Sequence, residues 1–573
     1  MTTTQQKSTE TTSSIHPVIK RIFEKRKLST ENIYHFFSNS LHELPDLMSL
    51  KDLDKSSDRI IEAIEKGETI GVWGDYDVDG TTSCALLYHF FKMCGAKTEL
   101  FQPSRFVEGY GVHPSSIDQA IEKGLKLLIT VDCGISNVET AEYAISKGID
   151  LIITDHHKDA RETMPKAYAI VNPNRRDETC HPDLRRLAGV GVGFALALKI
   201  KNDLAKKGIE IPSIYPLLQF VAIGTICDMA ELNPMNLKLV RHGLKQMKNS
   251  TYPGILQFLS EDDKALATVP SERLSFTIGP MINSKGRLDH PEKALLLLTA
   301  ENSDVAYQNF AQLEISNRER RIIQSEVFKG AKEMALRELD SGDMVVNIVY
   351  SPDWHEGVIG IVASKLVETF GAPAVVFTNA EEEGVIKASA RSVGELNMFN
   401  LLKQCEEFYT RFGGHKAAAG LSMPKENFDA FKNKMKLLVN EIPAALRTKL
   451  DHFDIYLEAQ EITPDLIRQL DALEPFGMGN NRPIFRLKGV KLDTYKVLKD
   501  AHVKWNFCNK ANPAQKFGGI SFNFLDKWGE LDPSEIYSRQ DQEEMTLQFT
   551  LGLNRYNGNE FIQLNVEKVL FSA

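Results

Sequence analysis

The sequence predicts an α/β protein whose largest domain is built on a mostly parallel sheet. Two observations support this fold class. Short runs rich in β-branched residues alternate with segments of helical pattern between about residues 60 and 228. The runs are apolar almost throughout, which is typical of strands buried on both faces of a parallel sheet. Strands are expected at 69–73, 98–102, 126–131 and 149–154, with helices at 81–94 and 117–123 between them, so the series consists of βαβ units.

A long helix and a second α/β lobe follow. Residues 301–339 carry apolar side chains at helical spacing, many charges and no proline, which predicts a helix connecting two lobes. Strands are then expected at 345–350, 374–377 and 385–390, and helices at 358–370 and 427–440. From about residue 451 the pattern changes to short alternating strands, such as 503–507, 546–553 and 561–566, which is typical of a small β-barrel.

These patterns predict six segments. The first residues are rich in Thr, Ser and Gln and lack the apolar core of a signal peptide, so we expect a disordered tail. The expected segments are the tail at 1–15, a helical element at 16–58, the parallel-sheet domain at 59–300, the connecting helix at 301–339, the smaller α/β lobe at 340–445 and the barrel at 446–573.

Composition limits the class of protein only loosely. The 573 residues suffice for roughly three or four domains. The net charge of −9 counts mildly against a nucleic-acid binder but allows a local basic groove. Seven scattered cysteines without a CxxC pair argue against structural zinc and a disulfide framework and fit a reducing cytoplasm. No apolar run reaches about 18 residues, so no membrane span is expected.

Four acidic clusters at the ends of apolar runs carry the functional signal. They contain Asp75, Asp77 and Asp79; Asp132; Asp155, His156 and His157; and Asp228. The carboxyl ends of parallel strands meet at one edge of a sheet, so the first three clusters should converge. Carboxylates this close cannot all stay ionised without cations between them. Two divalent metals about 3.5–4 Å apart are the natural solution, and such a pair suits hydrolysis of a phosphate ester.

The first cluster has a spacing that needs a geometric reason. Its acids alternate, so a continuing strand would direct all three to one side. Gly80 would then permit a tight turn, and Thr81 and Thr82 would cap the next helix. A calcium loop is a poor alternative, because Leu86 stands where the bidentate Glu is required.

Each cluster also has a simpler interpretation when taken alone. The first cluster, Asp132 and Asp228 would each be explained as ordinary helix caps. The adjacent histidines after Asp155 are harder to explain structurally, and imidazole favours manganese, iron, zinc or cobalt over magnesium. The joint occurrence of the four clusters favours the metal site.

In this order and spacing, the four clusters resemble the motifs of the DHH phosphoesterase superfamily. Further segments resemble the RecJ family of single-strand-specific exonucleases, and the resemblance runs from about residue 16 to the C-terminus. These segments are 105–111, 189–193, 279–290, 354–360, 389–392, 413–415 and 475–480.

The resemblance implies a DHH lobe, a long helix, a DHH-associated lobe and an oligonucleotide-binding (OB) β-barrel. It also implies 5′→3′ degradation of single-stranded DNA to mononucleotides in DNA repair and recombination, with two divalent ions, Mn²⁺ or Mg²⁺. A cytoplasmic monomer is expected, with a helicase and a single-strand-binding protein as partners. Asp77, Asp79, Asp132, His156 and Asp228 match the family's metal ligands. Asp75 and His157 match neighbouring positions, and Asp155 would orient a histidine.

Candidate substrate-binding residues occur in both lobes. Asn283 and Arg287, in a Gly-rich loop, could hold a phosphate near the metals, and Arg105 with Tyr110 could hold the strand. Met281 stands where an Arg is expected in many relatives, which would remove one phosphate contact. A group in the second lobe would bind the 5′-terminal phosphate: Ser389, Arg391, Gly413, Gly414 and His415.

Aromatic side chains offer candidates for base stacking. Trp354 and His355 could stack on a base, although a core Trp is at least as plausible. In the barrel the candidates are Tyr495, Trp505 and Phe507, of which about half should belong to the core.

Three other functions were weighed. A non-catalytic DNA-binding relative is disfavoured because every acidic motif is intact. An enzyme for short oligonucleotides or cyclic dinucleotides is disfavoured by the predicted barrel. A family II pyrophosphatase shares only the acidic core, and pyrophosphate turnover would support it.

Overall fold

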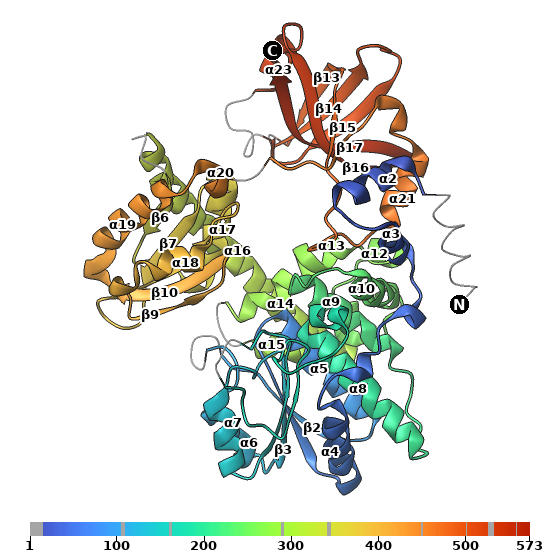
Figure 1. Ribbon diagram of the computed structural model, residues 1–573, viewed down its shortest axis with the longest axis vertical. Helices are drawn as coiled ribbons and strands as arrows, with labels where there is room; N and C mark the ends of the chain where they lie inside the picture. Colours follow the sequence, from blue (N-terminus) through green and yellow to red (C-terminus); the bar gives the residue numbers. More distant parts are fainter. Residues whose placement is uncertain are drawn as a thin grey trace. The chain divides into compact units, whose positions relative to one another are not determined.

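The computed structural model describes residues 15–104, 109–159, 163–287, 291–340, 345–448, 451–499, 501–524, 532–556 and 559–572. The described residues fall into two compact units (Figure 1). The first lies within 1–286, 290–310 and 452–573, and the second within 287–289 and 311–451.

A five-stranded parallel sheet forms the centre of the first unit, which confirms the predicted α/β class. Its order is β2-β1-β3-β4-β5, and every neighbouring pair is parallel. The strands are β1 (Thr69–Gly74), β2 (Lys97–Phe101), β3 (Leu127–Val131), β4 (Asp150–Thr154) and β5 (Ala169–Val171). The four strands predicted in this region are therefore present.

Helices cover both faces of this sheet (Figure 1). On one face α6 (Pro114–Glu122) and α7 (Val138–Ser146) pack against apolar side chains of β3 and β4. On the other face lie α4 (Leu53–Lys66), α5 (Val78–Met93) and α8 (Gly189–Lys206). This burial on both faces explains why the strands read as continuous apolar runs.

A predominantly apolar helix, α9 (Leu218–Cys227), packs against α5, α8 and α10 (Pro234–Met247). Residues 218–226 are all buried, as expected for a helix without a polar face. Its C-terminal end presents Asp228. Shorter helices complete the region: α11 (Pro253–Leu256), α12 (Glu261–Ala265), α13 (Ser271–Arg273), a π-helical turn η5 (Leu274–Ile278), α14 (Gly279–Lys285) and α15 (Glu292–Leu298).

The C-terminal region contributes a seven-stranded sheet with the order β11-β12-β16-β17-β15-β14-β13. Its strands are β11 (Ile455–Tyr456), β12 (Phe485–Leu487), β13 (Val490–Leu498), β14 (His502–Asn509), β15 (Lys516–Ser521), β16 (Glu544–Tyr556) and β17 (Asn559–Ser572), accompanied by α21 (Pro464–Asp471) and α23 (Pro533–Arg539). Trp505 and Phe507 are fully buried in its core, so they are unavailable for base stacking, whereas Tyr495 is 37% exposed.

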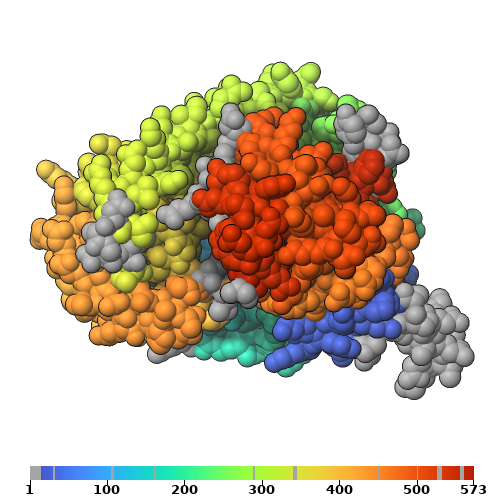
Figure 2. Space-filling model, turned by 90° about the horizontal axis from the view of Figure 1, so that it is seen from above, coloured from blue at the N-terminus to red at the C-terminus, as the bar shows by residue number. Residues whose placement is uncertain are grey.

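The N-terminal helices α2 (Pro17–Lys25) and α3 (Thr30–Phe37) belong to the same unit as this sheet. The backbone N–H of His16 donates to Oε1 of Gln469 at 2.8 Å, and Arg26 forms an ion pair with Asp454 at 2.8 Å. Figure 1 shows the blue helices α2 and α3 beside the orange helix α21, and Figure 2 shows blue atoms beside orange ones. Segments more than 400 residues apart in the sequence are therefore joined by hydrogen bonds, of which that between Arg26 and Asp454 is charge-assisted.

The second unit contains a mixed sheet of order β6-β7-β8-β10-β9, in which only β6 and β7 pair in parallel. Its strands are β6 (Asn347–Tyr350), β7 (Ala374–Asn379), β8 (Val385–Arg391), β9 (Arg411–Gly414) and β10 (Ala418–Pro424). Helices α16 (Ser303–Asp340) and α17 (Glu356–Phe370) form one apolar cluster with the sheet. The long helix predicted at 301–339 is thus present.

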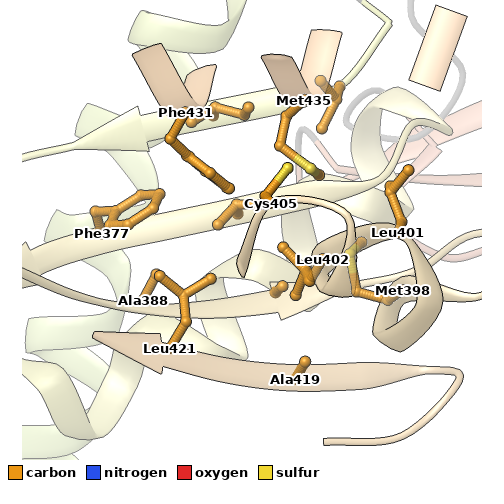
Figure 3. Close-up of a cluster of buried hydrophobic side chains, with 14 of the residues drawn as sticks. Phe377, Ala388, Met398, Leu401, Leu402, Cys405, Ala419, Leu421, Phe431 and Met435 are labelled. Carbon is orange, nitrogen blue, oxygen red and sulfur yellow. The ribbon is translucent and has the colours of Figure 1, made fainter. Parts of the chain in front are cut away.

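The second apolar cluster of this unit lies against α18 (Met398–Lys403) and α19 (Phe428–Glu441). Figure 3 shows Phe377, Ala388 and Leu421 from the strands facing Phe431 and Met435 from α19. A short helix, α20 (Ala444–Arg447), follows. In the described part of the chain, no helix combines the length and apolarity needed to cross a membrane.

Two helical glycines make opposite predictions for stability. A Cβ at Gly243 of α10 would lie 2.2 Å from the carbonyl oxygen of Leu218, whereas a Cβ at Gly193 of α8 would meet nothing within 4 Å. Gly193→Ala should stabilise the protein by about 0.5–1 kcal/mol, because it removes backbone freedom from the unfolded chain. Gly243→Ala should destabilise it by about 1–3 kcal/mol through overpacking. Urea denaturation of both variants measures these changes in the free energy of unfolding. Stabilisation by Gly243→Ala would contradict the packing of α10 on α9.

Candidate metal centre

The first acidic cluster lies where β1 passes into α5, and its geometry differs from the prediction. The strand ends at Gly74, and Asp77 is the N-cap of α5, accepting a hydrogen bond from the N–H of Gly80 at 3.0 Å. Asp79 therefore lies in the first helical turn. The expectation that a continuing strand aligns the three acids was wrong, because the capping carboxylate begins the helix immediately.

The predicted roles of Gly80, Thr81 and Thr82 were also wrong. Thr82 donates its hydroxyl back to the carbonyl of Val78 at 2.8 Å, inside the helix, instead of capping it. Gly80 is helical, and a Cβ there would lie 2.4 Å from the backbone oxygen of Asp75. Glycine is thus required for close approach of the strand end to the helix.

Asp75 begins the turn between β1 and α5 and is only 1% exposed, and its Oδ1 has no hydrogen-bond partner. The side chain of Gln102 holds the turn by donating to the Asp75 carbonyl at 3.0 Å and to the Thr81 hydroxyl at 2.8 Å. No sequence pattern indicated Gln102, since it lies 27 residues from Asp75.

Asp79 is held by the start of α8. Its two carboxylate oxygens accept hydrogen bonds from the N–H groups of Gly189 and Val190 at 2.6 and 3.0 Å. Amides at a helix N-terminus favour a negative charge. A Cβ at Gly189 would lie 2.7 Å from Oδ1 of Asp132, and one at Gly224 would lie 2.6 Å from Oδ1 of Asp79. These glycines allow α8 and α9 to reach the carboxylates.

Asp132 follows β3 in a left-handed conformation with φ of 59° and is 2% exposed. Asp155 follows β4, and its Oδ2 accepts the N–H of Ile135 at 2.9 Å. Its Oδ1 lies 2.8 Å from Nδ1 of His157, so Asp155 orients that ring as expected.

Two asparagines after β5 position the histidine pair. Asn174 donates to the carbonyl of His156 at 2.7 Å, and Asn172 donates to that of His157 at 3.0 Å. Neither was found from the sequence, because an isolated amide side chain carries no spacing signal.

The side chains converge on the ring of His156. Its Nε2 lies 3.1 Å from Oδ1 of Asp132, 3.9 Å from Oδ2 of Asp79 and 3.8 Å from Oδ2 of Asp228. Within the described ranges, two overlapping sets have potential ligand atoms within 4.8 Å of one another: Asp132, His156 and His157, and Asp79, His156 and Asp228. Asp132 Oδ1 and His156 Nε2 are buried without a hydrogen-bond partner. Buried polar atoms normally have partners, so this donor set suits a divalent cation.

The pKa values of the carboxyl groups in the metal-free centre also indicate a cation site. Burial, with the charge of Asp77, raises the pKa of Asp79 to about 7. Burial, with the charge of Asp79, raises the pKa of Asp228 to about 8, and the pKa of the Asp132 carboxyl is also raised well above its usual range. Protons thus take the place that cations would otherwise fill.

The pKa values of the two histidines are shifted in opposite directions. Burial and the neighbouring His157 lower the pKa of His156 to about 4, so its ring is neutral. Burial alone would lower the pKa of His157, but the hydrogen bond and charge of Asp155 outweigh it and raise this pKa to about 9. The pair therefore offers one neutral ligand nitrogen and one cation.

Predicted substrate-binding residues of the first unit have different outcomes. The hydroxyl of Tyr110 donates to the carbonyl of Asp132 at 3.0 Å and lies 3.1 Å from Nδ1 of His157, at the rim of the centre. Arg105 lies outside the described residues. Asn283 belongs to α14, so the expected Gly-rich loop is a helix, and Met281 is buried in it.

The other predicted residues belong to the second unit. The guanidinium of Arg287 lies 3.4 Å from the carbonyl of Gly357 at the start of α17. His355 caps this helix, with Nδ1 accepting the N–H of Gly357 at 3.1 Å. Trp354 is half-buried against the apolar cluster of α16 and α17, which favours the core interpretation.

Ser389 and Arg391 lie together on β8. Nη1 of Arg391 donates to Oγ of Ser389 at 2.9 Å, and both side chains approach Gly360, where a Cβ would be 3.0 Å from each. Gly420 of β10 is in register with Ser389 on one side and with Gly413 on the other. Gly413, Gly414 and His415 are exposed. The sheet thus brings the predicted group to one end of β8, β9 and β10.

Comparison with known protein families covers each region. Residues 69–225 match the DHH family N-terminal domain, residues 342–441 match the DHHA1 domain, and residues 453–568 match the RecJ OB domain. The expectation of an OB domain after a DHH-associated lobe is therefore confirmed.

Individual relatives agree with these matches. The single-stranded-DNA-specific exonuclease RecJ of Bacillus subtilis is 32% identical over 518 residues, which cover 89% of this chain and 64% of that protein. A crystal structure of RecJ from Thermus thermophilus in complex with Mn²⁺ superposes with a TM-score of 0.77 at 26% identity, covering 97% of this chain and 78% of that one. The protein of the same name from Escherichia coli is 30% identical over 573 residues, covering 97% of this chain and 96% of that protein. With this identity over nearly the whole of both sequences, the chain belongs to the RecJ family.

Proposed function

We propose that this protein is a metal-dependent exonuclease that degrades single-stranded DNA from the 5′ end to 5′-mononucleotides. The observation that carries the proposal is the pair of buried atoms without hydrogen-bond partners, Asp132 Oδ1 and His156 Nε2, facing each other within an acidic cluster. Family membership supplies the substrate class, since the relatives are single-stranded-DNA-specific exonucleases.

In this proposal five residues hold two divalent ions, Mn²⁺ or Mg²⁺: Asp77, Asp79, Asp132, His156 and Asp228. A metal pair held there would polarise the scissile phosphate and lower the pKa of an attacking water toward neutrality. The neutral imidazole of His156 keeps a lone pair available, and the Gly189 and Val190 amides fix the orientation of the Asp79 carboxylate. Asp75 is buried within the turn between Gly74 and Val78, next to these ligands in the sequence.

His157 and Tyr110 would contact the substrate at the rim. The Asp155 carboxylate keeps His157 oriented and cationic, so its imidazolium can donate to a phosphate oxygen. The Tyr110 hydroxyl, close to that ring, is placed to contact the same phosphate. Asn283 and Arg287, with Arg105, are proposed to hold phosphates further along the strand.

The second unit would determine the polarity of digestion. Arg391 is oriented by Ser389, and exposed backbone at Gly413 and Gly414 with the imidazole of His415 lies on the neighbouring strand of the sheet. Together with the start of α17, beside His355, this group offers a cation, an imidazole and exposed backbone for a 5′-terminal phosphate.

The cellular setting is inferred from the same family. We propose a cytoplasmic monomer that acts in DNA repair and recombination, supplied with single strands by a helicase and assisted by a single-strand-binding protein.

Removal of one central ligand tests the metal centre. Asp132→Asn should reduce turnover by more than about 100-fold, since loss of even an outer partner of a metal ligand typically costs 10–100-fold. The measurement is digestion of a long single strand labelled at either end, with Mn²⁺, Mg²⁺ or EDTA, beside its duplex. The exposed Asp541→Asn serves as the control and should digest like the wild type. Wild-type rates in Asp132→Asn would disprove the assignment.

The pKa shifts predict how metal binding depends on pH. Because the pKa values of Asp79 and Asp228 are raised to about 7 and about 8, the folded metal-free protein binds more protons than the unfolded chain at intermediate pH. The stability contributed by these groups therefore falls as pH rises, and metal must displace their protons. The Tm increase caused by saturating Mg²⁺ should grow between roughly pH 6 and pH 8.5.

Differential scanning fluorimetry at each pH measures Tm in Mg²⁺ and in EDTA. The difference between the two Tm values removes the contributions of titratable groups outside the centre. Asp228→Asn should flatten the dependence. A Tm increase that stays constant over the range would contradict protonated carboxylates at the site.

Substitution of Arg391 tests how the protein selects the 5′ end of the strand. Arg391→Ala should reduce the preference for a 5′-phosphorylated over a 5′-hydroxyl strand by roughly tenfold, consistent with the loss of a charge-assisted hydrogen bond of about 1.5–3 kcal/mol. Metal affinity should not change. Lys403→Ala, an exposed cation at the end of α18, is the control. Equal rates on both strands in wild type and variant alike would remove this role.

A further inference from the structure

We propose that Met229 and Met478 form an apolar surface that contacts a nucleobase of the bound strand beside the metal centre. We refer to these two side chains as the methionine surface. The inference rests on the proposed nuclease function and adds a base-binding site to it.

Met229 combines two unfavourable features. It directly follows Asp228 and ends α9 in a left-handed conformation with φ of 58°. Glycine is the usual residue in that conformation, because any Cβ costs free energy there. The side chain is also 68% exposed to water, so it gains little from packing. Local stability would favour glycine, and a binding role accounts for a large apolar side chain at this position.

Met478 lies on a loop that is fixed to the chain following Met229. Its carbonyl accepts the N–H of Leu232 at 2.7 Å. A Cβ at Gly477 would lie 2.8 Å from Cδ1 of Leu232, and one at Gly479 would lie 2.5 Å from Cγ of Glu231. The glycines on both sides of Met478 therefore allow the loop to press against this segment.

The loop is also held from within. Asn480 is 2% exposed, and its side chain donates to the carbonyls of Leu473 and Pro475 at 2.8 and 2.9 Å. Gly477 and Asn480 form an isolated β-bridge. Although the backbone is fixed in this way, the Met478 side chain remains 55% exposed. The structure therefore presents this apolar side chain to solvent on a rigid support.

A nucleobase is the occupant that the position favours. Met229 directly follows Asp228, a residue of the metal centre, so its side chain starts beside the residues proposed to hold the metals. Thioether side chains are polarisable and adaptable, and they pack on flat rings without requiring particular hydrogen bonds. Such a contact accepts every base in turn, which an enzyme that removes successive nucleotides needs. Exposed apolar side chains near a functional site commonly mark a binding surface.

The decisive variant is Met229→Gly, because it removes the side chain and relieves the backbone conformation at once. Its Tm should equal or exceed that of the wild type, whereas KM for a single strand should rise about fivefold, somewhat less than the loss of one aromatic stacking contact would give. Met478→Ala should raise KM similarly. The matched control is Lys27→Gly, also exposed with a left-handed φ of 59°, which should raise Tm and leave KM unchanged.

A strand with abasic nucleotides near its 5′ end separates base contacts from phosphate contacts. Fluorescence anisotropy in EDTA should show weaker binding of the abasic strand by wild type, and equal affinity of both strands for Met229→Gly. The dependence of affinity on salt should be the same in both proteins, since no phosphate contact is lost.

Equal affinity of wild type and Met229→Gly for the intact strand would overturn the methionine surface as a base-binding site, and would leave a protein segment as its alternative occupant. Absence of cleavage by the wild type in Mn²⁺ would instead refute the nuclease proposal. The EDTA binding comparison remains informative in that case, so the two failures are distinguishable.

Discussion

Electrostatic repulsion among buried carboxylates is the constraint on which the rest of the first unit depends. Asp75, Asp79 and Asp132 are each 1–2% exposed, and Asp228 is close by. Without compensation such a group cannot remain ionised. The fold supplies part of the compensation through the amides at the start of α8 and the ring of His156. The remainder is the charge that divalent cations would bring, which makes the centre a site for catalysis on phosphates.

The helices around these carboxylates bring their backbone close to the carboxylate oxygens. Gly80, Gly189 and Gly224 lie where a Cβ would collide with an aspartate or its neighbours. The apolar α9 is buried along its length, which fixes the position of Asp228 at its end. The same segment then continues into Met229, and the N–H of Leu232 just beyond it donates to the carbonyl of Met478. Adjoining parts of the chain therefore serve both the proposed metal chemistry and the proposed base contact.

The second unit provides a different kind of chemistry. Its described residues contribute no acid to the two ligand sets of the metal centre, and its predicted binding residues are an arginine, a serine and exposed backbone on a mixed sheet. Such groups suit recognition of a phosphate end rather than its hydrolysis. The DHHA1 match at residues 342–441 falls within this second unit, whereas the DHH and OB matches fall within the first.

The sequence by itself determined the parallel sheet, the long helix and the four acidic clusters, because hydrophobic periodicity and strand-end position are local properties. Tertiary structure decided how the acids are arranged. The cap by Asp77 ended the strand, the expected loop around Asn283 proved helical, and Trp505 and Phe507 are core residues. Gln102, Asn172 and Asn174 had no local signal, since their importance lies in contacts with distant segments. Local pattern specifies an element, whereas the partners packed against it determine which polar atoms remain available for chemistry.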